Sequence, residues 1–203
     1  MGTRVAVDVG RSLGQLDRRV FGGFVEHLGR CIYGGLYDED APSRDERGFR
    51  QDTLELLRDL RLSVLRWPGG NFVSNYHWQD GIGPKDERPA RSELAWGGIE
   101  PNRFGTDEYI DYCRVLGVEP YICLNMGTGT LEEALAWVEY CNGTRSTAWA
   151  DRRRANGHPE PHAVTWWGLG NEIYGAWQVG AMSAEEYVAE ATRWARAIKM
   201  VDP

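Results

Sequence analysis

The sequence predicts an α/β fold: the first half of a (β/α)8 TIM barrel, with about four βα units on a parallel sheet. Short apolar runs alternate with amphipathic helical patterns, and polar residues follow directly after the apolar runs. The chain has 203 residues, fewer than the roughly 250 that a whole barrel requires. Barrel chemistry gathers at the carboxyl ends of the strands, so polar residues at those ends are the first functional candidates.

Strands are expected where β-branched and aromatic residues form short runs, and helices where apolar residues recur at helical spacing. The predicted strands of the sheet are residues 21–26, 63–67, 120–125 and 164–169. Helices are predicted at 51–60 and 107–116, from Thr130 onward and from Ser183 onward. Thr106 is the expected N-cap of the second helix, and Thr130–Glu133 and Ser183–Glu186 have the spacing of capping boxes.

Two further segments stand apart from this alternation. Residues 3–9 read as a strand followed by a turn at 14–17, so we predict an N-terminal unit of residues 1–18 and a half barrel of residues 19–203. Residues 76–105 form a long loop rich in glycine, proline and charge. A loop of that length inside a compact domain is usually functional.

Composition excludes several classes of protein. Hydrophobic residues make up 42% of the chain, which argues against disorder, and the net charge of −7 predicts no nucleic-acid partner. No run approaches the roughly 20 apolar residues of a membrane span, and the start of the chain does not have the pattern of a signal peptide. We expect reduced, mostly buried thiols in a cytoplasmic protein, because no C-x-x-C pair occurs among Cys31, Cys113, Cys123 and Cys141.

The sharpest candidate for chemistry is Glu172, which follows Asn171 at the end of the fourth strand. A strand-end carboxylate can serve as a general acid in a partly apolar pocket, and the neighbouring amide can bind a sugar hydroxyl. The residues expected to supply that pocket are Trp166, Trp167, Tyr174 and Trp177. The alternative is a turn with a solvated glutamate. A dinucleotide fingerprint is excluded, because Ile173 occupies the third glycine position.

Polar residues also follow the other strands: Glu26 the first, Arg66 and Asn71 the second, and Asn125 the third. Glu26 is open to a catalytic, a sugar-binding or a structural role, the last being a buried salt bridge with Arg66. The first and fourth strands lie nearly opposite across a closed barrel. Glu26 and Glu172 should therefore lie farther apart than the about 5–5.5 Å that separates the two carboxylates of a retaining pair. That separation suits a substrate contact better than a catalytic pair.

No metal or cofactor is expected. His158 and His162 are four residues apart, but Pro159 and Pro161 prevent a helix there, so we do not read them as a metal pair. The sequence has no other metal-ligand spacing, no phosphate-binding loop and no G-x-S-x-G nucleophile elbow.

Taken in order, these segments resemble glycoside hydrolase family 51, the intracellular α-L-arabinofuranosidases of the clan A barrels. The matching stretches are residues 19–30, 66–74, 78–84, 125–129, 138–142 and 167–172. One such stretch alone would be weak, but the ordered set spans nearly the whole chain.

The resemblance implies a role for each matched position. Glu172 is the expected acid/base of a retaining glycosidase, and Asn171 the expected contact of the sugar 2-hydroxyl. Glu26 and Asn71 are expected to bind the furanose ring, and Arg66 to orient the catalytic carboxylates. The implied substrates are arabinofuranosyl side chains of arabinan, arabinoxylan and their oligosaccharides. The implied assembly is a homo-oligomer, since hexamers are common in the family.

The resemblance also implies what these residues lack. The family places its nucleophile, a second glutamate, after the seventh strand, and residues 3–9 are expected to join a C-terminal β-sandwich that this chain does not contain. A double displacement requires that nucleophile. The expectation is therefore a truncated arabinofuranosidase that is inactive alone.

Two other interpretations stay open. Another clan A glycosidase, such as an endoglucanase or a β-xylosidase, would share the barrel, although Glu26 and residues 66–71 favour the arabinofuranosidase. A non-catalytic sugar-binding or assembly module would use the same strand-end residues. A half barrel with two open sheet edges is a poor scaffold for such a module.

Overall fold

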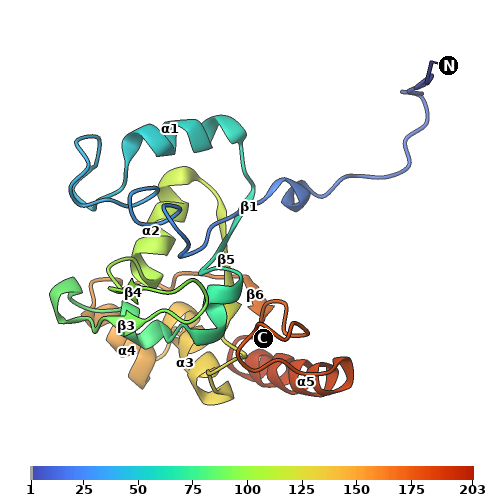
Figure 1. Cartoon of the computed structure of the whole chain (residues 1–203). Helices are drawn as coiled ribbons and strands as arrows, with labels where there is room; N and C mark the ends of the chain where they lie inside the picture. The colour runs from blue at the N-terminus through green and yellow to red at the C-terminus, as the bar shows by residue number, and fades with distance from the viewer. Residues whose placement is uncertain (1) are drawn as a thin grey trace.

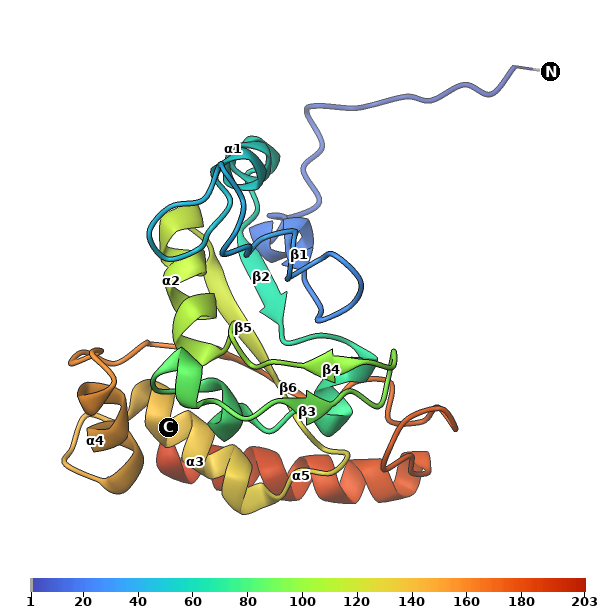
Figure 2. The ribbon, with the colours of Figure 1, turned by 60° about the vertical axis from the view of Figure 1, so that its left-hand side comes forward.

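The computed structural model describes residues 2–203, and its centre is one parallel sheet in the order β1-β2-β5-β6. The strands are β1 (Gly23–Phe24), β2 (Val64–Trp67), β5 (Glu119–Leu124) and β6 (Trp166–Leu169). The helices that follow them are α1 (Gln51–Leu60), α2 (Thr106–Leu116), α3 (Leu131–Asn142) and α5 (Ala184–Val201). These are the four βα units that the sequence predicts, and Figures 1 and 2 show α2 packed along β5 and α3 beside α5.

Two strand predictions need correction. Residues 3–9 form no strand and are fully exposed, because no other strand lies beside them to complete a ladder, and the turn falls at 9–10 rather than 14–17. Figure 1 shows this segment running away from the body of the protein. The segment predicted as a buried strand over 21–26 pairs with β2 only at Gly23 and Phe24, and Phe24 is 49% exposed. It is therefore a short edge strand.

The start of α2 lies one residue earlier than predicted. Gly105 is the N-cap, and its N–H donates to the Glu108 carboxylate at 2.9 Å. Thr106 is fully buried instead, and its hydroxyl accepts a hydrogen bond from the Trp137 indole at 3.0 Å. Packing against α3 therefore outweighs the capping preference of threonine here.

The two predicted capping boxes differ. At α5 the box is complete, because Ser183 and Glu186 each bond the other's backbone N–H. At α3 only half of it forms. Thr130 accepts from the Glu133 N–H, but the Glu133 carboxylate accepts from Nδ1 of His77 at 3.0 Å.

A fifth helix, α4 (Ala148–Ala155), is not predicted from the sequence, because half of its residues are charged and it shows little amphipathic pattern. Its anchor is Arg153, which is fully buried. The guanidinium donates to the backbone carbonyls of Tyr140 at 2.8 Å and Gly143 at 3.0 Å, which lie at the end of α3. Hydrogen bonds from a buried arginine thus attach α4 to the rest of the protein, whereas an apolar stripe attaches the other helices.

The core is rich in aromatic side chains. Trp67 of β2 stacks on Tyr109 of α2 with ring centroids 4.8 Å apart, and Trp78 stacks on Trp137 of α3 at 5.8 Å. All four side chains are at most 1% exposed. The Trp67–Tyr109 stack joins the sheet to α2, and the Trp78–Trp137 stack joins the loop over 76–105 to α3. The four cysteines are unpaired and three are buried, as predicted.

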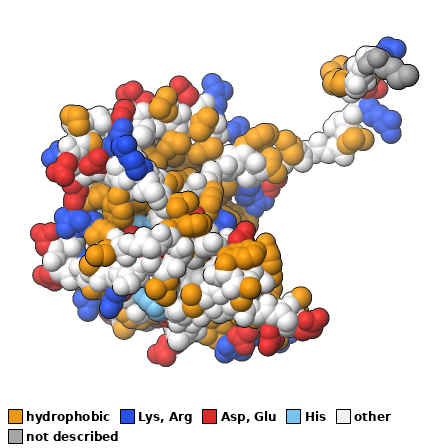
Figure 3. All heavy atoms as spheres, viewed as in Figure 1, with side chains coloured by type: hydrophobic (Ala, Val, Ile, Leu, Met, Phe, Trp, Pro, Cys, Tyr) orange, Lys and Arg blue, Asp and Glu red, His pale blue; other side chains and the backbone are white. Residues whose placement is uncertain are grey.

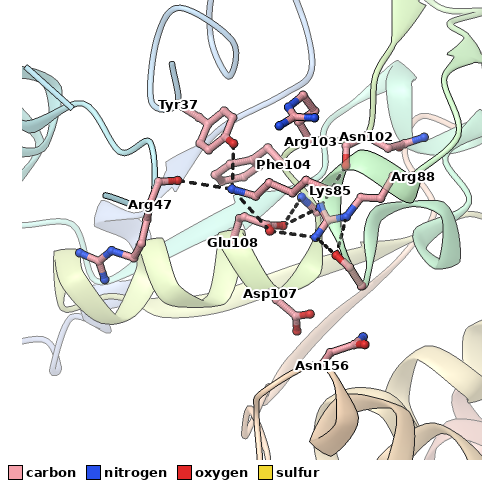
Figure 4. A network of polar contacts seen from close by, with 12 residues as sticks. Tyr37, Arg47, Lys85, Arg88, Asn102, Arg103, Phe104, Asp107, Glu108 and Asn156 are labelled. Carbon is pink, nitrogen blue, oxygen red and sulfur yellow. Dashed lines mark hydrogen bonds and ion pairs between the residues drawn. The ribbon is translucent and has the colours of Figure 1, made fainter. Parts of the chain in front are cut away.

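The long loop over 76–105 is structured and fastened to α2. It contains the 3-10 turns Trp78–Gly81 and Lys85–Glu87 and an antiparallel hairpin of β3 (Arg91–Ser92) and β4 (Ile99–Glu100). Glu108 accepts from Arg88 at 2.9 and 3.0 Å, and Arg88 also donates to the Gly83 carbonyl at 2.7 Å (Figure 4). Lys85 donates to the Tyr37 hydroxyl at 2.8 Å. The loop is therefore a fixed wall beside the strand ends.

Apolar side chains are exposed near β1. Val20 is 64% exposed and Phe21 55%, and Figure 3 shows apolar side chains where the N-terminal segment leaves the body. Among residues 2–203, no helix is long and apolar enough to cross a membrane.

A buried carboxylate ties α2 to α3 and to the segment before β6. Asp107 accepts from Tyr140 at 2.7 Å and from Nε2 of His162 at 2.9 Å. Burial alone would raise the pKa of Asp107, but the bonds from His162 and Tyr140 and the nearby His158 lower it below its usual range. Burial lowers the pKa of His162 and outweighs the opposite pull of Asp107. His162 is therefore a neutral donor in the folded protein near neutral pH.

This network predicts an acid-sensitive fold. Because the folded pKa of His162 lies below its unfolded value, the unfolded chain binds more protons as the pH falls through the usual histidine range. The free energy of unfolding should therefore fall with decreasing pH there, and the lowered pKa of Asp107 extends the loss to more acidic pH. Urea unfolding of wild type and His162→Gln at several pH values measures the histidine contribution, which the variant should lack.

His77→Gln is the matched control. The bond to Glu133 raises the pKa of His77, so His77 stabilises the fold below its unfolded pKa and loses that effect as the pH rises. The two variants should thus change the pH slope in opposite directions. Asp107→Ala should cost about 1–3 kcal/mol for each buried neutral donor that it leaves unpaired, namely Tyr140 and His162. Equal slopes in wild type and His162→Gln would contradict this account.

Candidate active site

The parallel register brings the predicted site residues to one edge of the sheet. Glu26 follows β1, Arg66 lies within β2, and Asn71 lies just beyond β2 in a 3-10 turn. Asn171 and Glu172 follow β6. Because all four strands run in the same direction, these side chains share the carboxyl edge of the sheet, as predicted.

Glu26 is a buried carboxylate with one oxygen engaged. Oε1 accepts from the backbone N–H groups of Gly70 at 2.8 Å and Phe72 at 3.1 Å, and from the Trp96 indole at 3.3 Å. Among the described residues 2–203, no donor bonds Oε2, which can accept from a ligand hydroxyl. No ion pair joins Glu26 to Arg66 in this part of the chain, so the alternative of a plain salt bridge is wrong.

Arg66 contacts an amide rather than a carboxylate. Its guanidinium donates to Oδ1 of Asn171 at 2.6 Å and to the Gly69 carbonyl at 3.2 Å, and it stacks over the Phe24 ring at 4.7 Å. Burial raises the pKa of the nearby Cys123 thiol despite the arginine, and that thiol donates to the Gly170 carbonyl. Arg66 therefore orients Asn171, the residue next to Glu172.

A residue that the sequence analysis did not single out completes the cluster. Gln178 is buried, and its amide nitrogen donates to Oδ1 of Asn71 at 2.7 Å and to the backbone carbonyl of Asn171 at 2.9 Å. Its amide oxygen accepts from the Ser74 hydroxyl at 2.8 Å. No local pattern marks such a residue, because two of its partners, Ser74 and Asn71, are more than a hundred positions away.

Glu172 is exposed at the edge of this cluster. Its backbone has φ of 45°, which is uncommon for a residue other than glycine, and its Oε2 accepts from the Trp177 indole at 3.3 Å. It lies on the rim of a pocket lined by Leu169, Ile173, Tyr174, Met182 and Tyr187 among others. Both Tyr174 and Trp177 flank it with their rings open to solvent.

The expected aromatic pocket is only partly formed. Trp166 donates to Glu119 and lies under Arg19, and Trp167 packs edge-on against Trp137 in the core. Successive residues of a strand point to opposite faces of the sheet, so these two tryptophans cannot both line one site. Trp177 is the one tryptophan that bonds Glu172 among the described residues.

Asn125 is a structural residue in this arrangement. Its Oδ1 accepts from the N–H groups of Gly127 and Thr128, and its Nδ2 donates to the Tyr76 carbonyl at 3.0 Å. Both the oxygen and the nitrogen of its amide are therefore engaged in holding the loop after β5.

His27 and Glu100 hold the hairpin that carries Trp96. The Trp67 indole donates to Nε2 of His27 at 2.9 Å, so Nδ1 carries the hydrogen that bonds Glu100 at 2.9 Å. Glu100 also accepts from the Tyr33 hydroxyl. Because Glu100 belongs to β4, this buried chain of bonds fixes the hairpin so that Trp96 reaches Glu26.

Metal-type ligands meet elsewhere, away from the strand ends. Residues 156–165 are not helical, as the prolines predict, yet the rings of His158 and His162 lie 5.1 Å apart. Their ligand atoms and those of Asp107 fall within 4.8 Å of one another. Arg114 donates toward Nδ1 of His162 at 3.4 Å, so Nε2 carries the hydrogen that bonds Asp107. A cation bound here would have to displace the hydrogen bond between His162 and Asp107. We therefore interpret the cluster as structural.

Together the strand ends present the chemistry of a polyol site. Arginine only donates, so Oδ1 of Asn171 must face Arg66 and its NH2 group is left for a ligand. The open oxygen of Glu26 accepts, and the exposed Glu172 carboxyl can exchange a proton with a ligand oxygen. The arrangement suits a sugar, whose hydroxyl groups both donate and accept.

Comparisons with known proteins identify the family and the fold. The sequence matches the family "Alpha-L-arabinofuranosidase 1 domain" over residues 56–203. It is 56% identical over 199 residues to the probable alpha-L-arabinofuranosidase C of Aspergillus fumigatus, covering 98% of this chain and 39% of that protein. It is 50% identical to an intracellular exo-alpha-(1->5)-L-arabinofuranosidase of Bifidobacterium longum, covering 91% of this chain and 32% of that protein.

Solved structures agree. The structure is similar to that of the GH51 alpha-L-arabinofuranosidase from Thermotoga petrophila, with a TM-score of 0.90, 61% sequence identity, and coverage of 92% of this chain and 39% of that chain. The fold is therefore that of the N-terminal part of a glycoside hydrolase TIM barrel. The chain belongs to the α-L-arabinofuranosidases of glycoside hydrolase family 51. It spans about two fifths of the length of the A. fumigatus and T. petrophila proteins.

The close approach of the β2 turn to Glu26 yields a test of the site's packing. A Cβ added at Gly69 would lie 2.5 Å from Cγ of Glu26. We expect Gly69→Ala to displace Glu26 and to cost about 1–3 kcal/mol of stability, as overpacking does. Urea unfolding measures the cost. Gly2→Ala, where a Cβ meets no atom within 4 Å, is the control. Equal stability of the two variants would show that Glu26 is not held against this turn.

Proposed function

We propose that this chain supplies the acid/base half of an α-L-arabinofuranosidase active site, with Glu172 as the general acid/base. The observation that carries the proposal is the pairing of an exposed carboxyl with a clamped amide. Glu172 follows β6 on the carboxyl edge of the sheet, and its neighbour Asn171 is held by Arg66 at 2.6 Å. The family and the names of its relatives support this reading.

The chemistry follows from the role of each group. In the first step the Glu172 carboxylic acid protonates the leaving glycosidic oxygen while a second carboxylate attacks the anomeric carbon and the C–O bond breaks. In the second step the Glu172 carboxylate takes a proton from water, which displaces the enzyme carboxylate and regenerates the acid. The second carboxylate should lie about 5–5.5 Å from Glu172, as in other retaining pairs. Three protein donors hold Oε1 of Glu26 and leave Oε2 open to a ligand hydroxyl, which supports a sugar-binding role for it.

The glycone contacts come from three strand ends. Asn171 is placed to donate to the 2-hydroxyl next to the reacting carbon, where a hydrogen bond strengthens as charge develops. Glu26 and Asn71 bind the other furanose hydroxyls, and Arg66 acts through Asn171. The substrates are arabinofuranosyl residues of arabinan, arabinoxylan or their oligosaccharides. The names of the relatives support the sugar, and the intracellular B. longum relative supports a cytoplasmic location.

Glu172→Gln tests the acid/base role. The assay uses a graft in which residues 2–203 replace the matching part of the T. petrophila enzyme, which supplies the rest of the barrel. Turnover of an aryl arabinofuranoside should fall about 10²- to 10⁴-fold, the usual worth of general acid–base catalysis. Azide should restore turnover, because it attacks the glycosyl-enzyme without needing a base. Glu55→Gln, an exposed change on α1, is the control. Full activity of Glu172→Gln would exclude the assignment.

The isolated 203-residue polypeptide is a separate test. We expect no measurable turnover of the same arabinofuranoside, because a double displacement requires the second carboxylate. Glu172-dependent turnover by this polypeptide would show that the nucleophile lies within it. Calorimetric titration with arabino-oligosaccharides distinguishes an inert polypeptide from the sugar-binding module considered above.

A further inference from the structure

Gln178 joins two strand-end loops through its side chain and a third loop through Ser74. The side chain bonds Asn71 and Ser74, which follow β2, and the backbone of Asn171, which follows β6. The Ser74 carbonyl in turn accepts from the N–H of Thr128, which follows β5, at 2.9 Å. Gln178 is 6% exposed, and each of its polar side-chain atoms has a partner at 2.7–2.9 Å.

The backbone around Gln178 is equally fixed. Its N–H donates to the Gly175 carbonyl at 2.9 Å, and the Gly175 N–H donates to the Glu172 carbonyl at 2.7 Å. Gly180 has φ of 79°, and a Cβ there would lie 2.8 Å from Cα of Gly127. The loop after β6 is thus packed against the loop after β5 with no room for a side chain. Gln178 is therefore held by its backbone as well as by its side chain.

These contacts determine which way each amide points. A backbone carbonyl only accepts, so the group that Gln178 turns toward Asn171 must be its NH2. The second hydrogen of that NH2 points to Asn71, which must answer with Oδ1. The Ser74 hydroxyl donates to the remaining amide oxygen of Gln178. As a result, Asn71 presents its NH2 group, and not its oxygen, to the space over the strand ends.

We propose that Gln178 is a positioning residue that sets the hydrogen-bonding polarity of Asn71, and thereby makes the glycone site a donor at that hydroxyl of the sugar. The proposal rests on the proposed arabinofuranosidase site. Arg66 fixes Asn171 in the same sense through Oδ1. Two amide NH2 groups are therefore left to donate to the ligand, and Oε2 of Glu26 is left to accept from it. Such a site takes a polyol in one orientation.

Gln178→Glu reverses this polarity without changing the shape of the side chain. A carboxylate has no hydrogen to donate, so it repels the Asn171 carbonyl, and Asn71 must rotate to donate to it. Asn71 then presents its oxygen to the ligand. Protonation of the new carboxyl returns one donor, so the defect should lessen as the pH falls. Gln178→Met removes the donors permanently, and its defect should not depend on pH.

The kinetic test uses the graft described above. At about pH 8 we expect kcat/KM of Gln178→Glu to fall at least tenfold, mainly through a higher KM. A tenfold fall corresponds to the loss of about one good hydrogen bond. The ratio of kcat/KM in Gln178→Glu to kcat/KM in wild type should rise as the pH is lowered toward about 5. Gln79→Glu makes the same change at an exposed position and should leave the ratio flat near one. A pH-independent loss in Gln178→Glu equal to that in Gln178→Met would overturn the proposal.

A second measurement does not depend on activity. In the ¹⁵N-labelled 203-residue chain, the side-chain NH2 protons of Asn71 should exchange quickly with water in wild type and slowly in Gln178→Glu, where they are bonded. Gln79→Glu should leave them unchanged. If the graft has no activity but these protons respond, the proposed function fails and the polarity inference stands. If they do not respond, the inference is wrong even in an active graft.

Ser74→Ala guards against a variant that fails to fold. It frees the amide oxygen of Gln178 while leaving the volume of the site nearly unchanged. Because the Asn171 carbonyl still requires the NH2 group of Gln178, we expect the Asn71 protons to exchange as in wild type and kcat/KM to fall less than in Gln178→Glu. Slow exchange of the Asn71 protons in Ser74→Ala, with a thermal transition like that of wild type, would overturn the proposal.

Discussion

The hydrogen bonds from the Gly70 and Phe72 N–H groups to Oε1 of Glu26 are the interaction on which the site depends. β1 has only two residues in the ladder, so the sheet alone holds this edge weakly. The carboxylate extends the attachment beyond the strand ends by taking donors from the β2 turn. That turn is brought so near that only glycine fits at Gly69. Once it is fixed, Asn71 and Ser74 are placed for their contacts with Gln178.

The site then acquires a polarity from a chain of one-way partners. Arg66 can only donate, and the Asn171 carbonyl can only accept. A side-chain amide carries both a donor and an acceptor, so a partner that only donates or only accepts fixes its orientation. An amide fixed in this way then fixes the orientation of the next amide that it bonds. The direction of the donors over the strand ends is therefore not a local property of Asn71 or Asn171. It follows from contacts between residues more than a hundred positions apart.

The sequence predicted what depends on local pattern. The four βα units, the bounds of α1 and the capping box of α5 follow from spacing within a few residues. The carboxyl-edge placement of Glu26, Arg66, Asn71, Asn171 and Glu172 follows from the same alternation, because parallel strands share one chemical end. Residues 3–9 have strand-like composition, but a strand also needs a neighbour, which composition does not report.

What the sequence could not show is settled by competition between distant partners. The half-formed capping box at α3 is one case, because His77 draws the Glu133 carboxylate away from the helix end. The burial of Thr106 under Trp137 is another. Gln178, Glu100 and Trp96 lie in segments with no periodic pattern, and their partners come from other strand ends. The roles assigned to the site residues by resemblance stay predictions until activity is measured.

The two neighbours at the end of β6 are treated oppositely by the structure. Asn171 is held at both ends, its side chain by Arg66 and its backbone carbonyl by Gln178. Glu172 is exposed, and Trp177 is its one side-chain partner within residues 2–203. Its left-handed backbone costs on the order of 1–3 kcal/mol for a residue with a Cβ. This backbone conformation sets Glu172 apart from Asn171, whose amide is held in place. A group that contacts the sugar in one geometry gains from rigidity, whereas a group that gives a proton to one oxygen and takes one from another must be reachable from both.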